Sequence, residues 1–459
     1  MTRHSAANAK PPGAECFRPC STLETIGSEA MTWIHEQVGA TILADTHEHL
    51  VEESRRVLPL NDWLLPCDDW SLLFKEYLQD DLYSSGMSQS EARRFYDPEV
   101  SAVKKYKIVS PYWERVQHTG YGKNFSITIR ELYGVDSFSL KNIHLLDTRY
   151  REVRKPGFYE HILKQVCNIS ICQVNSLERV FMETAQPSLL QQDLSIKEIT
   201  QCSLADIVKV KSELGVEVDS FTDWLAAIDL YFERFGRRAV AIKYVGAYYR
   251  ALNFAHVDRH VAERHFSTLV APRPFIGVEG AQALEDYLFH YCIKKAQDYG
   301  LPVKIHTGYH AGSNLMPLGR VRDNAADVCK LLQSYPDVRF VLMHIGYPYQ
   351  DEYIALCKHF TNAYIDMCWA WIINPEASVR FLTEFLVSAP ANKILTFGGD
   401  FTVAENIVGH SVIARKGIAE ALSALVHRGW IERGAVPDLI TRLMHQNAEE
   451  LFSNVTGPT

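Results

Sequence analysis

The sequence predicts an α/β protein with the (β/α)8 fold, the TIM barrel. Three observations predict it. Short apolar runs alternate with amphipathic stretches of helical periodicity, about eight strand-like runs can be counted, and most of the clear ones end in polar or glycine-rich residues. A length of 459 residues suits one large barrel with insertions, although the alternation alone would also fit a doubly wound sheet.

The C-terminal half carries the clearest pattern. Helices are expected over residues 283–300, 325–337, 351–360 and 377–390. Each leads into a short buried strand, in LPVKIHTG, VRFVLMHIG, NAYIDM and NKILTFGGD respectively. Gly300 is expected just past the end of the first helix, where glycine is favoured. Helices that alternate with buried strands indicate parallel βα units.

Earlier strands are fainter. The first is expected in ATILADTHEH, residues 40–49, and others over residues 168–176, over residues 178–185, and in RRAVAIKYV, which contains Lys243. A helix is expected over residues 158–166. With these the count of strands reaches eight.

The stretch between the first and second strands is too long for one βα loop. It contains helix-like patterns over residues 68–86 and 99–134, so we expect a helical insertion over about 51–140 that lies across the barrel mouth. Residues 1–40 are expected to form an N-terminal tail and lead-in, and residues 41–459 the barrel.

The composition is that of an ordinary globular protein, with 47% apolar and 22% charged residues and a formal net charge of −8. There is no basic stripe, so nucleic acid is not an expected partner, and no apolar run approaches the roughly 20 residues of a membrane helix. We expect a small-molecule substrate and a chain that can pair into a homo-oligomer.

The expected compartment is the cytoplasm. The N-terminus lacks the apolar core of a secretory signal, and the 10 cysteines are scattered, as reduced thiols packed in a core would be. Cys16 and Cys20 have the spacing of half a zinc site, but no second pair lies nearby in the sequence.

The segment ADTHEHL, residues 44–50, follows an apolar run that is expected to be a buried strand. Side chains two positions apart in a strand lie on the same side, so His47 and His49 would project together. Two imidazoles on one side suit a divalent metal ion. A pair of surface histidines at a strand end is the alternative.

Polar residues near other strand ends extend this pattern. Lys243, His306, His344 and Asp400 lie at or near the ends of expected strands, and in a barrel those ends converge on one mouth. Buried ionisable groups are costly unless they are paired or bound to metal, so packing alone does not readily produce such a set.

These residues and their motifs resemble the amidohydrolase superfamily, of the amidohydrolase-2 type. The similarity lies in the His-x-His of DTHEH, the lysine of IKYV, the histidines of KIHTG and LMHIG, and the aspartate of FGGD. IKYVGAYYR, HIGYPY, NAYIDM and APANKILTFGGD further resemble the amidohydrolase domain that is fused to a glutamine-synthetase-like domain in some proteins. No synthetase-like half is present in this sequence, which therefore resembles a stand-alone form.

The resemblance implies that one divalent ion is bound by His47, His49, His306 and Asp400. Zinc is the first expectation and manganese the alternative. In relatives with two ions the equivalent of Lys243 is carboxylated and bridges them, with the equivalent of His344 on the second ion; one ion is favoured here. A lysine that pairs with a neighbouring carboxylate is the other interpretation of Lys243.

Three residues are expected to act in catalysis: Asp400, His344 and Lys243. Asp400 would accept a proton from a water that the metal acidifies, and His344 would polarise a carbonyl or protonate a leaving group. Asp45 and Glu48 are candidates for orienting the metal ligands, with a turn aspartate and a solvated glutamate as the alternative.

Substrate contacts are expected from Arg250, His310 and Trp369. Arg250 would clamp a carboxylate, with a surface ion pair as the alternative, and His310 would face the mouth or solvent. Trp369 and Trp371 would wall the pocket if the strand continued through them, with core packing as the alternative. His410 and Arg415 are weaker candidates for the same role.

The expected function is therefore a metal-dependent hydrolase that attacks an amide or lactone bond of a small carboxylated substrate. A decarboxylase or a uronate-isomerase-like enzyme on the same metal site is the alternative. A metal-free scaffold that retains the barrel is a third hypothesis, against which the intact set of candidate ligands argues.

Overall fold

The computed structural model describes residues 27–58, 62–272 and 276–453. All its paired strands are parallel, in a three-stranded run in the order β1-β2-β3 and a six-stranded run in the order β4-β5-β6-β7-β8-β9. The strands are β1 (Leu43–Glu48), β2 (Ile169–Val174), β3 (Leu190–Gln192), β4 (Leu194–Ser195), β5 (Ile242–Tyr244), β6 (Val303–Ile305), β7 (Phe340–Met343), β8 (Ala363–Asp366) and β9 (Ile394–Leu395).

Backbone hydrogen bonds join the two runs into one closed barrel. β3 and β4 are a single extended segment interrupted at Asp193, whose amide donates to the carbonyl of Val174 in β2 at 2.8 Å. At the other junction, the amide of Thr46 in β1 donates to the carbonyl of Phe397 just after β9, at 3.0 Å. Counting β3 and β4 together, eight strands surround the barrel, and the predicted (β/α)8 fold is confirmed.

Seven of the eight predicted strands are present, but the strand predicted over residues 178–185 is wrong. That segment is an irregular loop, and the third strand of the barrel lies at residues 190–195 instead. The reason is that Gln192 and Asp193 are buried polar residues there, so this strand lacks an apolar run.

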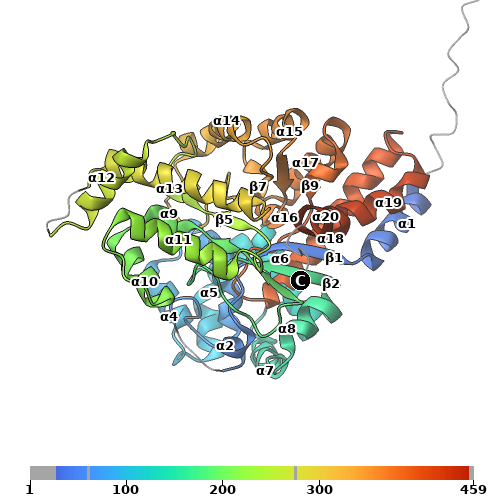
Figure 1. The fold of residues 1–459 in the computed structure, drawn as a ribbon. Coiled ribbons are helices and arrows are strands. Elements are labelled where there is room, and N and C mark those ends of the chain that lie inside the picture. Colours follow the sequence, from blue (N-terminus) through green and yellow to red (C-terminus); the bar gives the residue numbers. More distant parts are fainter. Residues whose placement is uncertain (1–26, 59–61, 273–275, 454–459) are drawn as a thin grey trace, which may run out of the picture.

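Helices cover the outside of the barrel (Figure 1). After β4 they are α9 (Lys197–Gln201), α10 (Leu204–Leu214), α11 (Phe221–Phe235), α12 (Arg259–Leu269), α13 (Val278–Asp298), α14 (Leu318–Ser334), α15 (Gln350–His359), α16 (Ala370–Ile373), α17 (Pro375–Ser388) and α18 (Glu405–His427). All four helices predicted in the C-terminal half are present, as α13, α14, α15 and α17. Gly300 has φ +68 just past α13, which is the left-handed conformation expected of a residue that ends a helix.

The stretch between β1 and β2 is helical. It contains α2 (Glu53–Val57), the 3-10 turn η1 (Trp70–Phe74), α3 (Tyr77–Ser84), α4 (Gln89–Tyr96), α5 (Ala102–Val116), α6 (Gly120–Tyr133), α7 (Ile143–Val153), α8 (Phe158–Glu160) and the π-helical turn η2 (His161–Val166). In Figure 1, α2 and α7 lie at the lower edge of the molecule. A cluster of aromatic rings that includes Trp70, Phe74 and Phe125 fills the interior of this stretch. Helix α6 packs along α18, which attaches the stretch to the barrel.

Both ends of the described chain pack against the barrel. Helix α1 (Gly27–Ala40) lies along α18, and Arg415 of α18 donates to the carbonyls of Val38 and Thr41 at 2.7 Å. Helix α20 (Asn447–Phe452) places Phe452 in a small apolar cluster with Ala44, Ala241 and other residues near the start of the strands. This cluster closes the end of the barrel opposite the strand ends.

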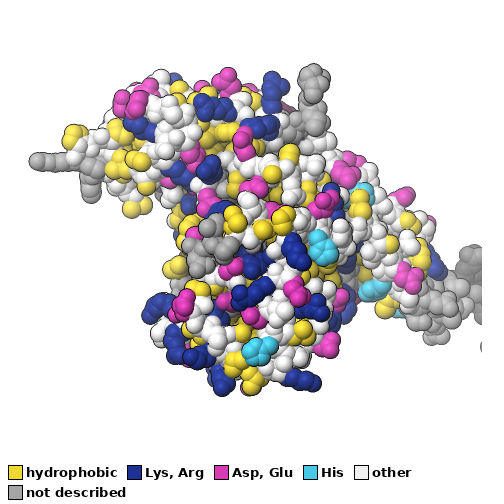
Figure 2. All heavy atoms as spheres, turned by 90° about the horizontal axis from the view of Figure 1, so that it is seen from below, with side chains coloured by type: hydrophobic (Ala, Val, Ile, Leu, Met, Phe, Trp, Pro, Cys, Tyr) yellow, Lys and Arg dark blue, Asp and Glu magenta, His cyan; other side chains and the backbone are white. Residues whose placement is uncertain are grey.

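No helix within the described ranges is long and apolar enough to cross a membrane. On the face drawn in Figure 2, Lys and Arg side chains are interspersed with Asp and Glu. The eight described cysteines are free thiols, and seven of them are buried, whereas Cys16 and Cys20 lie outside the described residues.

Candidate active site

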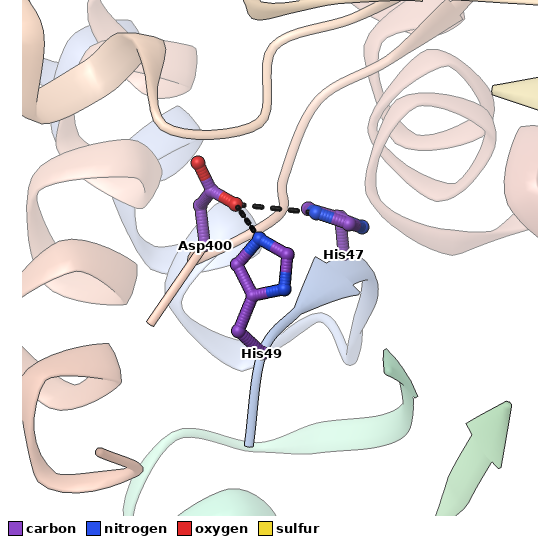
Figure 3. A group of neighbouring side chains, drawn as sticks. All are labelled: His47, His49 and Asp400. Carbon is purple, nitrogen blue, oxygen red and sulfur yellow. Dashed lines mark ion pairs between the residues drawn. The ribbon is translucent and has the colours of Figure 1, made fainter. Parts of the chain in front are cut away.

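Three candidate metal ligands meet at the C-terminal mouth of the barrel. Asp400 Oδ1 lies 3.2 Å from His47 Nε2 and 3.2 Å from His49 Nε2 (Figure 3). The second oxygen of Asp400 points away from both rings, and no hydrogen bond to it is present among the described residues. The pattern of two histidines two positions apart therefore does place both rings on one side of the strand end.

The turn that carries Asp400 is held by two buried acids. Glu48 accepts a hydrogen bond from the Phe401 amide at 2.6 Å, and Asp45 accepts one from the Gly399 amide at 3.4 Å. A Cβ atom at Gly399 would overlap the Glu48 carboxylate, so only glycine fits there. Asp45 and Glu48 thus act on the backbone beside Asp400, and not on the histidine rings as the sequence suggested.

The charges of this group are strongly coupled. Burial alone would raise the pKa of Asp400, but hydrogen bonds from His47 and His49 outweigh burial and hold that pKa well below its usual value. Burial and the nearby Lys243 lower the pKa of His47 to about 4. Asp400 is therefore a carboxylate and His47 a neutral imidazole near neutral pH, which is the protonation state that a metal ion requires of these two ligands.

The other nitrogens of the two histidines face oxygen acceptors. His49 Nδ1 lies 2.7 Å from the carbonyl of Asn175, and His47 Nδ1 lies 3.8 Å from Asp193. Asp193 is in turn bound by Lys304, whose ammonium lies 2.9 Å from both carboxylate oxygens. With a metal ion bound, His49 Nδ1 would donate to Asn175 and leave Nε2 as the coordinating atom, and Asp193 is the acceptor beside His47 Nδ1. The sequence analysis missed Asp193 because it did not detect the third strand.

His306 and His344 form a second pair next to this group. His306 Nε2 faces the carbonyl of Tyr309 at 2.9 Å, and His344 Nδ1 faces the carbonyl of Cys368 at 3.0 Å, so each of these nitrogens is a donor. The two remaining nitrogens, His306 Nδ1 and His344 Nε2, then face each other at 2.9 Å. In neutral rings both carry lone pairs, and burial lowers the pKa of each histidine, which disfavours a shared proton. A cation beside His306 Nδ1 would relieve the repulsion between the two lone pairs.

Lys243 lies at the edge of the candidate ligands. Its ammonium is 3.2 Å from His47 Nε2 and 2.6 Å from Met343 Sδ, and burial lowers its pKa to about 8 although the Asp400 charge opposes this. It forms no ion pair with a carboxylate within the part of the chain that is described, so the interpretation of Lys243 as a paired lysine is wrong.

These donors fit a divalent metal ion. Ligand atoms of His47, His49 and Asp400 all lie within 4.8 Å of one another, as do those of a second group, His344, Cys368 and Asp400. Imidazole nitrogens and a carboxylate are the usual ligands of catalytic zinc sites.

A cavity of about 440 Å³ opens beside these residues. Its charged and aromatic lining includes His49, Glu76, Asp80, Lys197, Glu198, Lys243, Tyr248, His306 and Asp400. A groove of about 1000 Å³ lies elsewhere, around Arg55 and Arg238, but no strand-end candidate residue lines it. The smaller cavity is the one that reaches the candidate ligands.

Arg250 does not line this cavity. Its guanidinium pairs with Asp286 and lies 3.4 Å from Glu285, so it is committed to two buried carboxylates of α13. The sequence analysis considered a surface ion pair as the alternative for Arg250, and the ion pair found here is buried. Arg250 does not face the cavity, so it is not available there to bind a substrate carboxylate.

The other predicted substrate residues are also buried. His310 is 3% exposed and stacks on Tyr248, a residue of the cavity wall, at 4.7 Å between ring centroids. Trp369 is fully buried, stacks on Tyr77 at 4.4 Å and lies edge-on to His344 at 5.5 Å. The strand β8 already ends at Asp366, and Trp369, with φ +64, lies just before α16, so Trp371 belongs to that helix and its indole donates to the Thr396 carbonyl at 2.8 Å.

The two weaker candidates are structural. His410 is fully buried against Phe397, at 5.1 Å between ring centroids, and Arg415 binds carbonyls at the end of α1. Neither residue lines the cavity.

Backbone strain concentrates at the mouth. Of the eight non-glycine residues with positive φ in the described chain, five lie there: Glu76, His344, Ile345, Trp369 and Asp400. Such conformations cost free energy and persist where the surrounding structure imposes them, most often at functional sites. Among the five, the sequence analysis had not identified Ile345, which follows His344, or Glu76, which lies in the helical stretch after β1.

Comparison with known proteins agrees with this geometry. Residues 229–453 match the family described as amidohydrolase. Over 95 residues, 20% of this chain, the sequence is 33% identical to protein fluG of Emericella nidulans. The match spans only 10% of the length of that curated relative.

Solved structures share the fold across nearly the whole chain. Uronate isomerase of Thermotoga maritima has a TM-score of 0.74 at 12% identity, covering 92% of this chain and 97% of that one. Glucuronate isomerase of Caulobacter crescentus has a TM-score of 0.74 at 17% identity, covering 94% and 95%. A candidate metal-dependent hydrolase of Lactobacillus casei has a TM-score of 0.62 at 16% identity, covering 92% and 97%. At these identities the likeness establishes the fold.

Proposed function

Because this chain belongs to the amidohydrolase superfamily, we propose that it is a metal-dependent hydrolase acting on an amide or lactone bond of a small carboxylated substrate. The observation that carries the proposal is the meeting of His47, His49 and Asp400 at the cavity, with one carboxylate oxygen of Asp400 still free.

His47, His49 and Asp400, with His306 through Nδ1, would hold one divalent ion. Zinc is the first choice because imidazole-rich sites suit it, and manganese is the alternative. When bound, such an ion supplies Lewis acidity to the attacking water and to the carbonyl under attack. Lys243 stands close enough to His47 to take part, either as an ammonium or as a carboxylated bridge to a second ion.

Asp400 would serve as the proton acceptor. Its Oδ1 faces the histidines, which leaves Oδ2 to take the proton of the attacking water and to pass it to the leaving group. The low pKa of Asp400 keeps it ionised for this task. His344 donates its Nδ1 proton to the Cys368 carbonyl and presents only a lone pair at Nε2, so it would act as a positioning residue beside His306 and not as a direct proton donor.

Lys197 would bind the carboxylate of the substrate in place of Arg250. It follows β4 in the cavity wall, is half-buried, and forms no ion pair or side-chain hydrogen bond among the residues described. A cation of this kind in a cavity is a suitable partner for an anionic group.

Isomerisation or decarboxylation on the same residues is the second candidate. It is favoured by the similarity to the two uronate isomerases, which extends over more than nine-tenths of this chain. An isomerase would move a proton between adjacent carbons of an open-chain sugar acid, whereas a decarboxylase would release carbon dioxide.

Isotope labelling of the products distinguishes these reactions. The metal content of the purified protein is measured first, and we expect about one equivalent of zinc or manganese per chain. Turnover in ¹⁸O-water is then expected to place the label in a product carboxylate. Deuterium incorporated at carbon from D₂O would instead identify an isomerase, and carbon dioxide release a decarboxylase. A protein without stoichiometric metal would contradict all three.

His306 and His344 offer a matched pair of variants. His306→Ala is expected to lower metal occupancy at least about tenfold, because it removes one of the three imidazoles proposed as ligands. His344→Ala is expected to retain metal and lose turnover. Full metal occupancy in His306→Ala, measured by elemental analysis after dialysis, would show that the ligand set is misassigned.

A further inference from the structure

Glu76 lies in the wall of the candidate cavity, although it belongs to the helical stretch after β1. It occupies the junction between η1 and α3 and lines the same cavity as His49 and Asp400. Its side chain makes no capping hydrogen bond to α3, so it is not there to begin the helix.

One oxygen of Glu76 is fixed in place. Oε1 accepts hydrogen bonds from the amide of Thr402, at 2.8 Å, and from the Thr402 hydroxyl. The neighbouring Tyr77 donates its hydroxyl to the carbonyl of Asp400. Two consecutive residues of the helical stretch thus hold the segment that carries Asp400.

The other oxygen of Glu76 has no partner. Oε2 is shielded from solvent and accepts no hydrogen bond, which is costly for a carboxylate group. Two other acids of the cavity wall have charged or backbone partners: Glu198 keeps one buried oxygen without a hydrogen bond but is paired with Lys209 at 3.0 Å, and Asp80 accepts from the Gly312 amide at 2.8 Å. Among the described residues, Glu76 forms no ion pair.

The backbone at Glu76 is strained. Its φ is 71 and its ψ is −120, the conformation that the first central residue of a type II′ turn adopts and that glycine occupies most easily. A carboxylate at a position suited to glycine indicates that the side chain has a use which offsets the strain.

We propose that Glu76 contacts the substrate through Oε2 and binds a hydroxyl or amino group on it. This role of Glu76 rests on the proposed function and narrows the class of substrate. If the substrate carboxylate binds Lys197, the substrate is an acid that also carries a hydrogen-bond donor for Glu76. The occupant of the cavity would supply the partner that Oε2 lacks in the protein itself.

Binding of simple acids tests this without turnover. The probes share one carbon skeleton: butanoate and its 2-, 3- and 4-hydroxy and amino derivatives. The readout is the shift in thermal midpoint of the metal-loaded protein, with affinities from calorimetry. At least one derivative is expected to bind about tenfold more tightly than butanoate, the size of one hydrogen bond to a charged group.

Glu76→Gln is the decisive variant. If the amide oxygen keeps its bonds to Thr402, the NH₂ group replaces Oε2 and offers a donor where an acceptor stood. The preference for the hydroxy or amino derivative is expected to disappear while butanoate binding persists. Lys197→Met is expected to lose binding of the whole series. Glu91→Gln, the same change in α4 of the same helical stretch but outside the cavity lining, is expected to leave binding unchanged.

A variant that relieves the backbone strain distinguishes a role of the Glu76 side chain in binding from a role in stability. Glu76→Gly is expected to lose the preference while the thermal midpoint stays level or rises by about 1–3 °C. Equal binding of all probes by the wild type, or a preference that survives in Glu76→Gln, would overturn the proposal. Neither result depends on which reaction the labelling experiments find, and metal content reports separately on the proposed function.

Discussion

Two groups of buried charges lie within the same barrel and differ in how completely they are satisfied. In the interior, Lys304 donates to the Thr46 carbonyl, to Gln173 and to both oxygens of Asp193, all at 2.8–2.9 Å. At the mouth, Asp400 and Glu76 each keep one oxygen without a hydrogen bond from the described residues. The two groups touch, because Asp193 also faces His47.

The difference separates structure from function. A buried network in which the cation and the carboxylate are both bonded rigidifies the interior, and removing one of the two leaves an uncompensated charge. A group with open positions is stable only because something else completes it, whether metal, substrate or water. The variants below test whether the two groups behave in these two ways.

The largest effect is expected from Asp400→Asn. Losing the charge and the proton acceptor should lower kcat/KM by about 10³-fold or more and reduce bound metal, while the metal-free protein keeps its thermal midpoint. Kinetics, elemental analysis and a melting curve measure the three quantities. The control is Asp323→Asn on exposed α14, which should match the wild type. A metal-free Asp400→Asn protein that is grossly unfolded would show that the mouth is structural as well.

Lys304→Met is expected to have the next largest effect, and on stability. It leaves the Asp193 carboxylate buried without its cation, at a cost of about 3–5 kcal/mol in the free energy of unfolding. Urea unfolding measures this. Lys295→Met, which breaks the half-exposed pair with Asp229, should cost at most about 1 kcal/mol. Similar costs for the two variants would remove the distinction between the groups.

The smallest effect concerns pH. Burial lowers the pKa of His410 from 6.5 to about 3, although the nearby Gly399 backbone and the Asp400 charge act in the opposite direction. Between these values the unfolded chain binds a proton that the folded protein does not, so stability falls as pH drops below 6.5. In His410→Leu the slope of unfolding free energy against pH should decrease by up to about 1.4 kcal/mol per unit.

Urea unfolding at several pH values between 7 and 4 measures that slope. His427→Leu, an exposed change on the same helix, is the control and should keep the slope of the wild type. An unchanged slope in His410→Leu would mean that other buried histidines account for the whole acid sensitivity.

Most of the barrel could be predicted from the sequence because its strands are apolar and its helices amphipathic. The exception was the third strand, LQQDLS, whose buried Gln192 and Asp193 erase the apolar signal. Asp193 is there because it binds Lys304, a contact 111 residues away in sequence that no local pattern reveals. The third strand was therefore missed because its buried residues are polar and a search for apolar runs does not detect it.

The candidate site was predictable to a similar degree. His47, His49 and Asp400 follow apolar runs, and their convergence is a consequence of the barrel. Glu76 and Lys197 lie outside the clear strand patterns, and nothing in their neighbouring residues marks them. Arg250 had the right residue type for binding a carboxylate, but Glu285 and Asp286, one helix away, determine its partners.

The apolar cluster around Phe452 affects how small molecules can enter and leave the barrel. Within the described residues, α20 covers the base of the barrel and the Lys304 ammonium lies 5.0 Å from the Phe452 ring, whereas the cavity with the candidate ligands lies at the opposite end. In the proposed reaction, product would therefore leave by the route through which substrate enters, past the side chains of Glu76 and Lys197.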